Sequence, residues 1–176
     1  MQIDEWQKII NEHGPAVWQS AYRLLGNHAD ASDCFQETFV CAVQFCRRQP
    51  VRNFSALLSR LVVARAIDLL RLRFRNQKHS CDLVKMSPSP AANDEPIQHL
   101  QNQELAENLR KALAKLPRQE AAVFCLRYLD DMTYQQIADE LGIKINAAGV
   151  LLNRAKTRLR KYLEISSKER KVEVIK

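Results

Sequence analysis

The stretch that decides the fold runs from Leu116 to Leu163 and reads LPRQEAAVFCLRYLDDMTYQQIADELGIKINAAGVLLNRAKTRLRKYL. It predicts a helix, a short acidic turn, a second helix, a tight turn and a long basic helix. Thr133 and Gln136 have the spacing of a capping box, in which each side chain binds the backbone N–H of the other residue. Gly142 stands where a helix commonly ends in the left-handed conformation. Asn146 is expected to cap the next helix.

The last helix of this stretch has one apolar face and one polar, cationic face. At 3.6 residues per turn, the apolar face collects Ala148, Leu152, Ala155, Leu159 and Leu163. The opposite face collects Asn146, Val150, Asn153, Arg154 and Lys161. Any small bundle can show such helices, and a basic face is often only solvated. The coincidence of the cap, the glycine turn and the cationic helix favours a helix-turn-helix that binds the DNA major groove.

Composition predicts an all-α fold. The chain has 176 residues, 46% of them hydrophobic, and only 4 glycines, and it lacks the alternation that strands need. We expect two small helical domains, residues 1–78 and 99–176, joined by a flexible linker over residues 79–98 that contains SPSPAANDEP. Without a run of about eighteen apolar residues or a signal peptide, the expected location is the cytoplasm.

Charge is unevenly distributed along the chain. Residues 1–43 carry −4, residues 44–78 carry +8, residues 79–140 carry −4 and residues 141–176 carry +7. Two separate cationic blocks suggest two contacts with a polyanion. A membrane surface ranks below nucleic acid, because the basic helices lack an apolar face rich in Trp and Phe.

Within residues 1–78, a helix is expected over Asp4–Leu25 with an interruption at Gly14-Pro15, and another helix opens at Asp30. A basic turn, RRQPVRN, precedes a helix over Phe54–Arg75 that is apolar nearly all round at first and arginine-rich at its far end. Asp68 is expected to pair with Arg65 or Arg71.

No cofactor, metal site or enzymatic reaction is predicted. The five cysteines show no zinc-ligand spacing, and His79 with Cys81 would be half of a metal site at most. Carboxylates in the first 78 residues lie on a helix edge, and Asp130-Asp131 reads as a turn. A recombinase or nuclease would need clustered carboxylates or a positioned nucleophile.

Four segments together resemble bacterial RNA polymerase sigma factors of the extracytoplasmic-function (ECF) type. They are DASDCFQETF (Asp30–Phe39), ARAIDLLRLRFR (Ala64–Arg75), LPRQEAAVFCLRYLDDMTYQQIADELGI (Leu116–Ile143) and NRAKTRLRKYL (Asn153–Leu163). The resemblance implies a sigma factor that directs core RNA polymerase to promoters. Its implied partners are core polymerase, promoter DNA and an anti-sigma factor, with no membrane.

The resemblance also implies three sets of contact residues. Core polymerase would be bound by Asp30, Asp33, Gln36, Glu37 and Phe39. The −10 promoter element would be recognised and melted by Arg52, Asn53, Phe54, Arg60, Arg65, Asp68, Arg71 and Arg73. The −35 element would be bound by Thr133, Tyr134, Asn146, Ala147, Val150, Asn153, Arg154, Lys156 and Arg158.

The chain departs from the family pattern in two places. Leu57 and Ala64 stand where family members usually carry Trp and Asn in the melting helix. The recognition helix begins with Ala147, Gly149, Val150 and Leu151 in place of the usual polar and basic run. Asn146 and Asn153 remain to read adenine edges, and apolar side chains can meet thymine methyl groups. An A/T-leaning upstream element is therefore the hypothesis.

A free-standing helix-turn-helix regulator, bound to an operator as a dimer, is the alternative. It explains Leu116–Leu163 but assigns no role to the cationic block at residues 44–78 or to the acidic edge at Asp30–Glu37.

Overall fold

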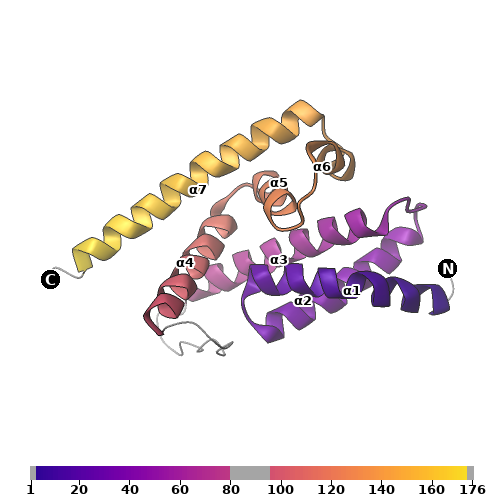
Figure 1. The fold of residues 1–176 in the computed structure, drawn as a ribbon, viewed down its shortest axis with the longest axis horizontal. Coiled ribbons are helices and arrows are strands. Elements are labelled where there is room, and N and C mark those ends of the chain that lie inside the picture. The colour runs from indigo at the N-terminus through magenta and orange to yellow at the C-terminus, as the bar shows by residue number, and fades with distance from the viewer. Residues whose placement is uncertain (1–2, 80–95, 174–176) are drawn as a thin grey trace.

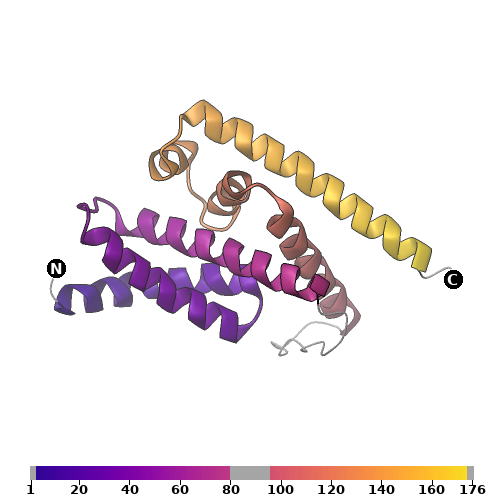
Figure 2. The same ribbon diagram turned by 180° about the vertical axis from the view of Figure 1, so that it is seen from behind.

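The computed structural model describes residues 3–79 and 96–173, which form seven helices and no strand within those ranges. In chain order they are α1 (Ile3–Leu25), α2 (His28–Cys46), α3 (Phe54–His79), α4 (Pro96–Lys115), α5 (Arg118–Tyr128), α6 (Tyr134–Leu141) and α7 (Ile145–Glu173). Helices α1–α3 form a first domain and α4–α7 a second. The two domains pack against each other, and α7 lies on the side of the second domain away from the first (Figures 1 and 2). The predicted all-α fold with two helical domains is confirmed.

Helix α3 is the centre of the molecule. It packs against α1 and α2 of its own domain and against α4, α5 and α6 of the other. Five of its apolar side chains are almost fully buried, as expected for a helix that is apolar nearly all round at first: Leu58, Val62, Val63, Ile67 and Leu70. One cluster of buried apolar side chains continues from the first domain into the second. Removal of this surface from water holds the two domains together.

Helix α1 is continuous, and the interruption expected at Gly14-Pro15 is wrong. Pro15 lies inside the helix, where it cannot donate the N–H that would bond the carbonyl four residues earlier. The apolar stripe continues on its C-terminal side through Val17, Ala21 and Leu24, all buried. Packing of that stripe on α2 and α3 outweighs the one lost hydrogen bond.

Helix α2 begins two residues before the expected position at Asp30. The Asn27 side chain accepts a hydrogen bond from the Asp30 backbone N–H at 2.8 Å, so the N-cap is Asn27. Ala31, Phe39 and Ala42 are buried on the inner side of α2, whereas Phe35 and Cys46 are only half-buried.

The N-cap predicted at Asn146 is also wrong. The helix begins at Ile145, so Asn146 lies in its first turn, and the Ala148 N–H bonds the Lys144 carbonyl at 3.1 Å. Helix α7 continues through Glu173. Its Lys, Glu and Arg residues have good intrinsic helix propensity.

Both neighbouring helices enter the predicted linker, since α3 extends to His79 and α4 begins at Pro96. Residues 80–95 of that linker, with Cys81, lie outside the described residues, as does the side chain of His79. In α4, Leu113 is buried whereas Leu105 is exposed. Within the described ranges, no helix has both the length and the apolar character needed to cross a bilayer.

Candidate nucleic-acid interface

The second domain contains a helix-turn-helix made by α6, the turn at Gly142, and α7. Both halves of the capping box are present: Thr133 Oγ1 accepts from the Gln136 N–H at 3.3 Å, and Gln136 Oε1 accepts from the Thr133 N–H at 2.8 Å. Gly142 has φ 63°, in the left-handed region. Ala138 of α6 and Ala155 of α7 are buried, and α6 packs against α7. The predicted capping box and glycine turn are confirmed.

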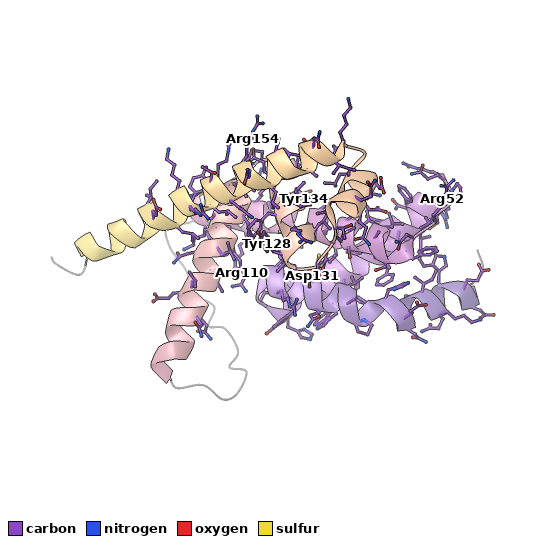
Figure 3. The ribbon with its side chains drawn as sticks, turned by 45° about the horizontal axis from the view of Figure 1, so that its top comes forward. Arg52, Arg110, Tyr128, Asp131, Tyr134 and Arg154 are labelled. Carbon is purple, nitrogen blue, oxygen red and sulfur yellow. The ribbon has the colours of Figure 1, made fainter. Side chains whose placement is uncertain are left out.

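The outer face of α7 is open to solvent. It carries the exposed side chains of Asn146, Val150, Asn153 and Arg154. Val150 is 51% exposed, which leaves an apolar group in the middle of this face. Figure 3 shows Arg154 on the side of α7 that points away from the other helices. Ala147, also predicted to contact the −35 element, is half-buried beside this face.

Two other predicted −35 residues, Lys156 and Arg158, interact with α5. The Lys156 ammonium lies 5.3 Å from the centre of the Tyr128 ring, within cation–π range. Arg158 Nε lies 3.2 Å from Glu120 Oε2, and the Glu120 residue is only 4% exposed. These contacts fix the position of α7 on the domain.

Tyr134 stands at the start of α6, partly exposed, with the Arg127 guanidinium 5.6 Å from its ring centre. Arg127 also donates a hydrogen bond to the Met132 carbonyl at 2.9 Å. The turn between α5 and α6 is therefore held by a side chain of α5. Asp131 in this turn has φ 50°, a conformation that Asp tolerates better than most residues.

In the first domain, the loop between α2 and α3 presents Asn53 and Arg52 to solvent, and Arg52 can be followed in Figure 3. The Asn53 side chain accepts from the Ala56 N–H at 3.1 Å and so caps α3. The Phe54 ring, half-buried, meets Trp6 edge to face with centroids 6.1 Å apart.

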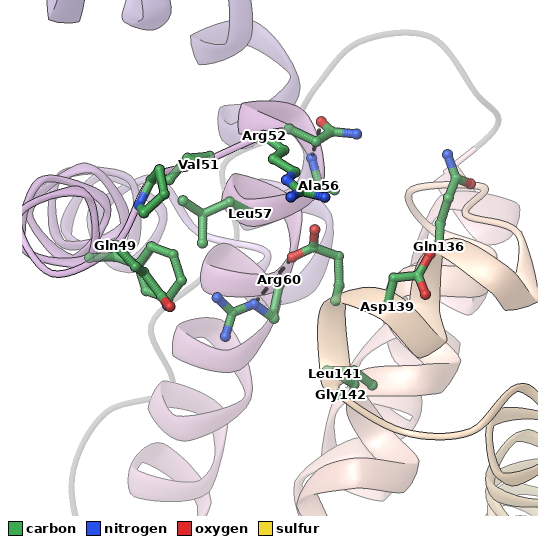
Figure 4. Close-up of a pocket in the computed structure, with 14 residues that line it drawn as sticks. Gln49, Val51, Arg52, Ala56, Leu57, Arg60, Gln136, Asp139, Leu141 and Gly142 are labelled. Carbon is green, nitrogen blue, oxygen red and sulfur yellow. Dashed lines mark hydrogen bonds and ion pairs between the residues drawn. The ribbon is translucent and has the colours of Figure 1, made fainter.

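A cleft of about 850 Å³ separates this loop from α6 (Figure 4). Arg52, Leu57 and Arg60 line one wall, and Asp139 and Glu140 line the other. Arg60 Nε lies 3.4 Å from Glu140 Oε2 across the cleft. Burial raises the pKa of the Glu140 carboxyl, and the neighbouring guanidinium partly opposes that shift. The cleft is thus basic on the first domain and acidic on the second.

The other charged residues predicted to contact the −10 element are engaged within the protein. Arg65 pairs with Glu37 of α2. Asp68 Oδ1 accepts from Arg118 at 2.6 Å and lies 3.8 Å from Arg71, which confirms the expected Asp68–Arg71 pair. Arg71 donates to the carbonyls of Ala114 at 3.3 Å and Leu116 at 2.6 Å.

Two arginines bind the carbonyl groups at the C-terminal end of α1. Arg110 of α4 donates to Leu24 O at 2.9 Å and to Arg23 O at 3.4 Å, and Arg73 of α3 donates to Leu25 O at 3.2 Å. Glu107 accepts from Arg73 at 3.1 Å and lies 3.6 Å from Arg110. Burial lowers the pKa of Arg110, and the Glu107 charge opposes that change. The last carbonyls of a helix have no intrahelical partner and attract cations.

Gly26 makes this approach possible. It has φ 73°, and a Cβ built on it would lie 2.4 Å from Arg110 Cζ. Nearby, the Ser20 hydroxyl donates to Asp130 Oδ1 at 2.5 Å across the domain boundary. Burial raises the pKa of Asp130, and the serine hydrogen bond opposes the shift.

Helix α2 carries the residues predicted to bind core polymerase. Asp33 and Gln36 are exposed, whereas Asp30 accepts from the Asn27 amide at 2.7 Å and Glu37 pairs with Arg65. Phe39 is only 7% exposed and packs on Phe35, so its side chain belongs to the core.

Sequence reasoning missed the contacts of Glu107, Arg110 and Arg118. The sequence indicates these contacts only through the positions of the three charged residues, which lie next to apolar positions on α4 and at the start of α5. The two residues of α3 that depart from the family pattern differ in exposure: Leu57 is 2% exposed and borders the cleft, whereas Ala64 is exposed.

Known families match both domains. The Sigma-70 region 2 family matches residues 9–76, and the Sigma-70 region 4 family matches residues 106–159. A region 2 followed by a region 4 in one helical chain defines the sigma-70 class of transcription initiation factors. The chain belongs to the ECF RNA polymerase sigma factor family.

Individual relatives support this assignment. The chain is 32% identical over 141 residues to SigL of Mycobacterium tuberculosis, covering 77% of this chain and 75% of SigL. It is 29% identical over 167 residues to SigE of Mycolicibacterium smegmatis, covering 95% of this chain but 65% of SigE. A solved structure of the sigma factor RpoE with the anti-sigma factor NepR from Bartonella quintana has the same fold. Its TM-score is 0.56 at 20% identity, with 93% of this chain and 99% of that chain covered.

Proposed function

We propose that this protein is a promoter-specificity subunit of bacterial RNA polymerase, with no reaction site of its own. The observation that carries the proposal is a helix-turn-helix with an open outer face on α7, following a region-2 domain in the same chain. A promoter has two elements about two DNA turns apart, and two linked DNA-binding domains can contact both.

In this proposal the outer face of α7 enters the major groove of the −35 element. Asn146 and Asn153 can each bond an adenine edge, Val150 can contact a thymine methyl group, and Arg154 can bind phosphate. Two asparagines and an apolar valine near the start of this face favour an A/T-leaning sequence. A G-rich consensus from selection on random duplexes would contradict this reading.

The first domain supplies the remaining functions. The exposed part of α2, with Asp33 and Gln36, would bind core polymerase. The loop containing Arg52 and Asn53, followed by α3, would hold the −10 element after melting. Basic and aromatic groups bind single strands through phosphate attraction and base stacking. Such a protein would work in the cytoplasm, and an anti-sigma factor, as in the RpoE–NepR complex, is its proposed inhibitor.

The test is run-off transcription with core bacterial RNA polymerase over a library of promoter fragments, with and without the protein. We expect a set of products that appears only when the protein is added. The Arg154→Ala variant should lose those products, whereas Lys8→Ala, an exposed cation on α1, should retain them. Asp33→Ala/Gln36→Ala should reduce binding to core polymerase and leave the binding of duplex DNA unchanged.

Failure to bind core polymerase in a pull-down, together with sequence-specific duplex binding as a dimer, would overturn the proposal in favour of a free-standing regulator. That alternative leaves the region-2 domain without a role.

A further inference from the structure

Another cleft, of about 500 Å³, lies between the C-terminal parts of α3 and α4. Its volume is within the range of sites that bind small molecules. Four of the seven residues that line it carry a positive charge, and none of these described lining residues is acidic. The lining consists of Arg71, Phe74, Arg75, Gln77, Lys111, Ala114 and Lys115. The α3–α4 cleft therefore attracts anions.

Arg71 forms a fixed wall of the α3–α4 cleft. Its guanidinium donates to the Ala114 carbonyl at 3.3 Å and to the Leu116 carbonyl at 2.6 Å. Asp68 Oδ1 lies 3.8 Å from its Nη1. Because these contacts use its donors, Arg71 contributes positive charge to the cleft more than free N–H groups.

The other three cations of the cleft have donors to offer. The exposed side chains of Arg75 and Lys111 form no ion pair or hydrogen bond with another residue of the described ranges. Lys115 Nζ lies 5.4 Å from the centre of the Tyr162 ring, a cation–π contact that supplies no oxygen acceptor. Cations gathered at one cleft repel one another, and a bound anion removes that repulsion. These three side chains are therefore available to hold an anionic ligand.

Phe74 adds an aromatic surface to the cationic cleft. Its side chain is half-buried, and the Arg73 guanidinium lies 5.5 Å from its ring centre. Aromatic side chains stack with the planar bases of nucleotides. Gln77, also exposed, carries an amide that can bond the edge of a base. An inorganic anion would use the cations of this cleft and leave Phe74 and Gln77 without a role.

We propose that the α3–α4 cleft binds a nucleoside di- or triphosphate. The phosphate oxygens bind Arg75, Lys111 and Lys115, and the base lies against Phe74. A chain of two or three phosphates has enough anionic oxygens for all three cations. Binding to the folded protein makes its stability depend on nucleotide concentration. Arg71 alone among the lining residues belongs to the predicted promoter contacts, so this site goes beyond the proposed function.

The experiment is isothermal titration calorimetry on the full chain with ATP, GTP and inorganic triphosphate, at an ionic strength of about 0.15 M. The test variant is Arg75→Ala/Lys111→Ala. The matched control is Lys8→Ala/Arg160→Ala, which also removes one arginine and one lysine, from exposed positions on α1 and α7. Both variants change the net charge equally, so only a local role separates them.

We expect ATP or GTP to bind the parent with one site per chain. A charge-assisted hydrogen bond corresponds to about tenfold in affinity, so the test variant should bind at least about tenfold more weakly. The control should stay within about twofold of the parent, because distant charges are screened. Phe74→Leu should weaken nucleotide binding about fivefold through lost stacking and leave the affinity for inorganic triphosphate unchanged.

Three results would overturn the proposal. The first is no saturable nucleotide binding to the parent, or equal weakening in the test variant and the control. The second is binding of inorganic triphosphate as tight as that of ATP and GTP, with no effect of Phe74→Leu, which would indicate an inorganic polyphosphate site. The third is a single-stranded oligonucleotide that displaces the nucleotide and loses as much affinity in the test variant, which would make the cleft part of a nucleic-acid path.

Circular dichroism checks that each variant keeps its helix content. If Phe74→Leu loses helix, Gln77→Ala at an exposed position replaces it and should also weaken nucleotide binding without changing the affinity for inorganic triphosphate. None of these measurements uses core polymerase or a promoter, so their outcome is independent of the run-off test.

Discussion

Replacing Arg158 by alanine should destabilise the protein while leaving its DNA affinity almost unchanged. Glu120 is 4% exposed and its Oε2 lies 3.2 Å from Arg158 Nε without accepting a hydrogen bond. Removal of one partner from a buried pair costs about 3–5 kcal/mol, but the Arg158 side chain is 50% exposed and solvent screens the pair. We therefore expect a loss of about 2 kcal/mol.

Urea unfolding followed by circular dichroism at pH 7 measures this loss. For a chain of this size, about 2 kcal/mol corresponds to a fall in Tm of about 4–8 °C. Glu120→Gln added to Arg158→Ala should recover part of the stability, because a neutral amide replaces the unpaired buried charge. Arg154→Ala is the matched control on the outer face and should stay within about 0.5 kcal/mol of the parent.

The salt dependence of duplex binding separates the two roles. The measured quantity is the slope of the logarithm of the binding constant against the logarithm of the salt concentration. Arg154→Ala should reduce the magnitude of this slope by about one, the value for a lost phosphate contact, and Arg158→Ala should leave the slope unchanged. If Arg158→Ala keeps its full stability and lowers the slope by about one, then Arg158 contacts phosphate and the structural role argued from Glu120 is wrong.

Three further results are expected. Open space surrounds both Gly142 and Gly149, so an added Cβ would meet no neighbour at either position. Gly142→Ala should lower the free energy of unfolding by about 1–2 kcal/mol through its positive φ alone, whereas Gly149→Ala, inside α7, should raise it by about 0.5–1 kcal/mol. Urea unfolding measures both changes. Because burial raises the pKa of Asp130 from 3.8, its contribution to stability is largest below that value and is lost as pH rises through the raised pKa. When the pH is raised from below 3.8 through this raised pKa, the Tm of Asp130→Asn should therefore fall less than the Tm of the parent. Finally, iodoacetamide at pH 8 should modify the exposed Cys41 first, as measured by mass spectrometry. Cys34 and Cys125 should be spared, because burial raises the pKa of Cys34 to about 11 and also raises the pKa of Cys125.

Local features of the fold could be predicted from the sequence because their determinants are neighbours in the chain. The Thr133–Gln136 capping box and the left-handed Gly142 each depend on residues within one helical turn. The exposed positions on α7 follow from helical periodicity. By contrast, the continuity of α1 through Pro15 depends on packing against other helices, which local propensity does not contain.

The role of each charged residue could not be predicted in the same way. Arg158 and Arg154 lie on one helix and differ only in that Arg158 meets Glu120, a residue far away in the sequence. Arg110 bonds the Leu24 carbonyl across 86 positions of the chain. A long cationic side chain has many possible partners, and only the packing of the helices selects one.

The arginine contacts at the end of α1 tie local order to domain position. The last turn of α1 depends on Arg110 for partners of the Arg23 and Leu24 carbonyls. When the second domain departs, those groups keep only water, and the last turn becomes free to fray. Amide hydrogen exchange there should quicken as the domains separate. The end of α1 thus acts as a built-in reporter of opening, although it belongs to the domain that the departing helices leave behind.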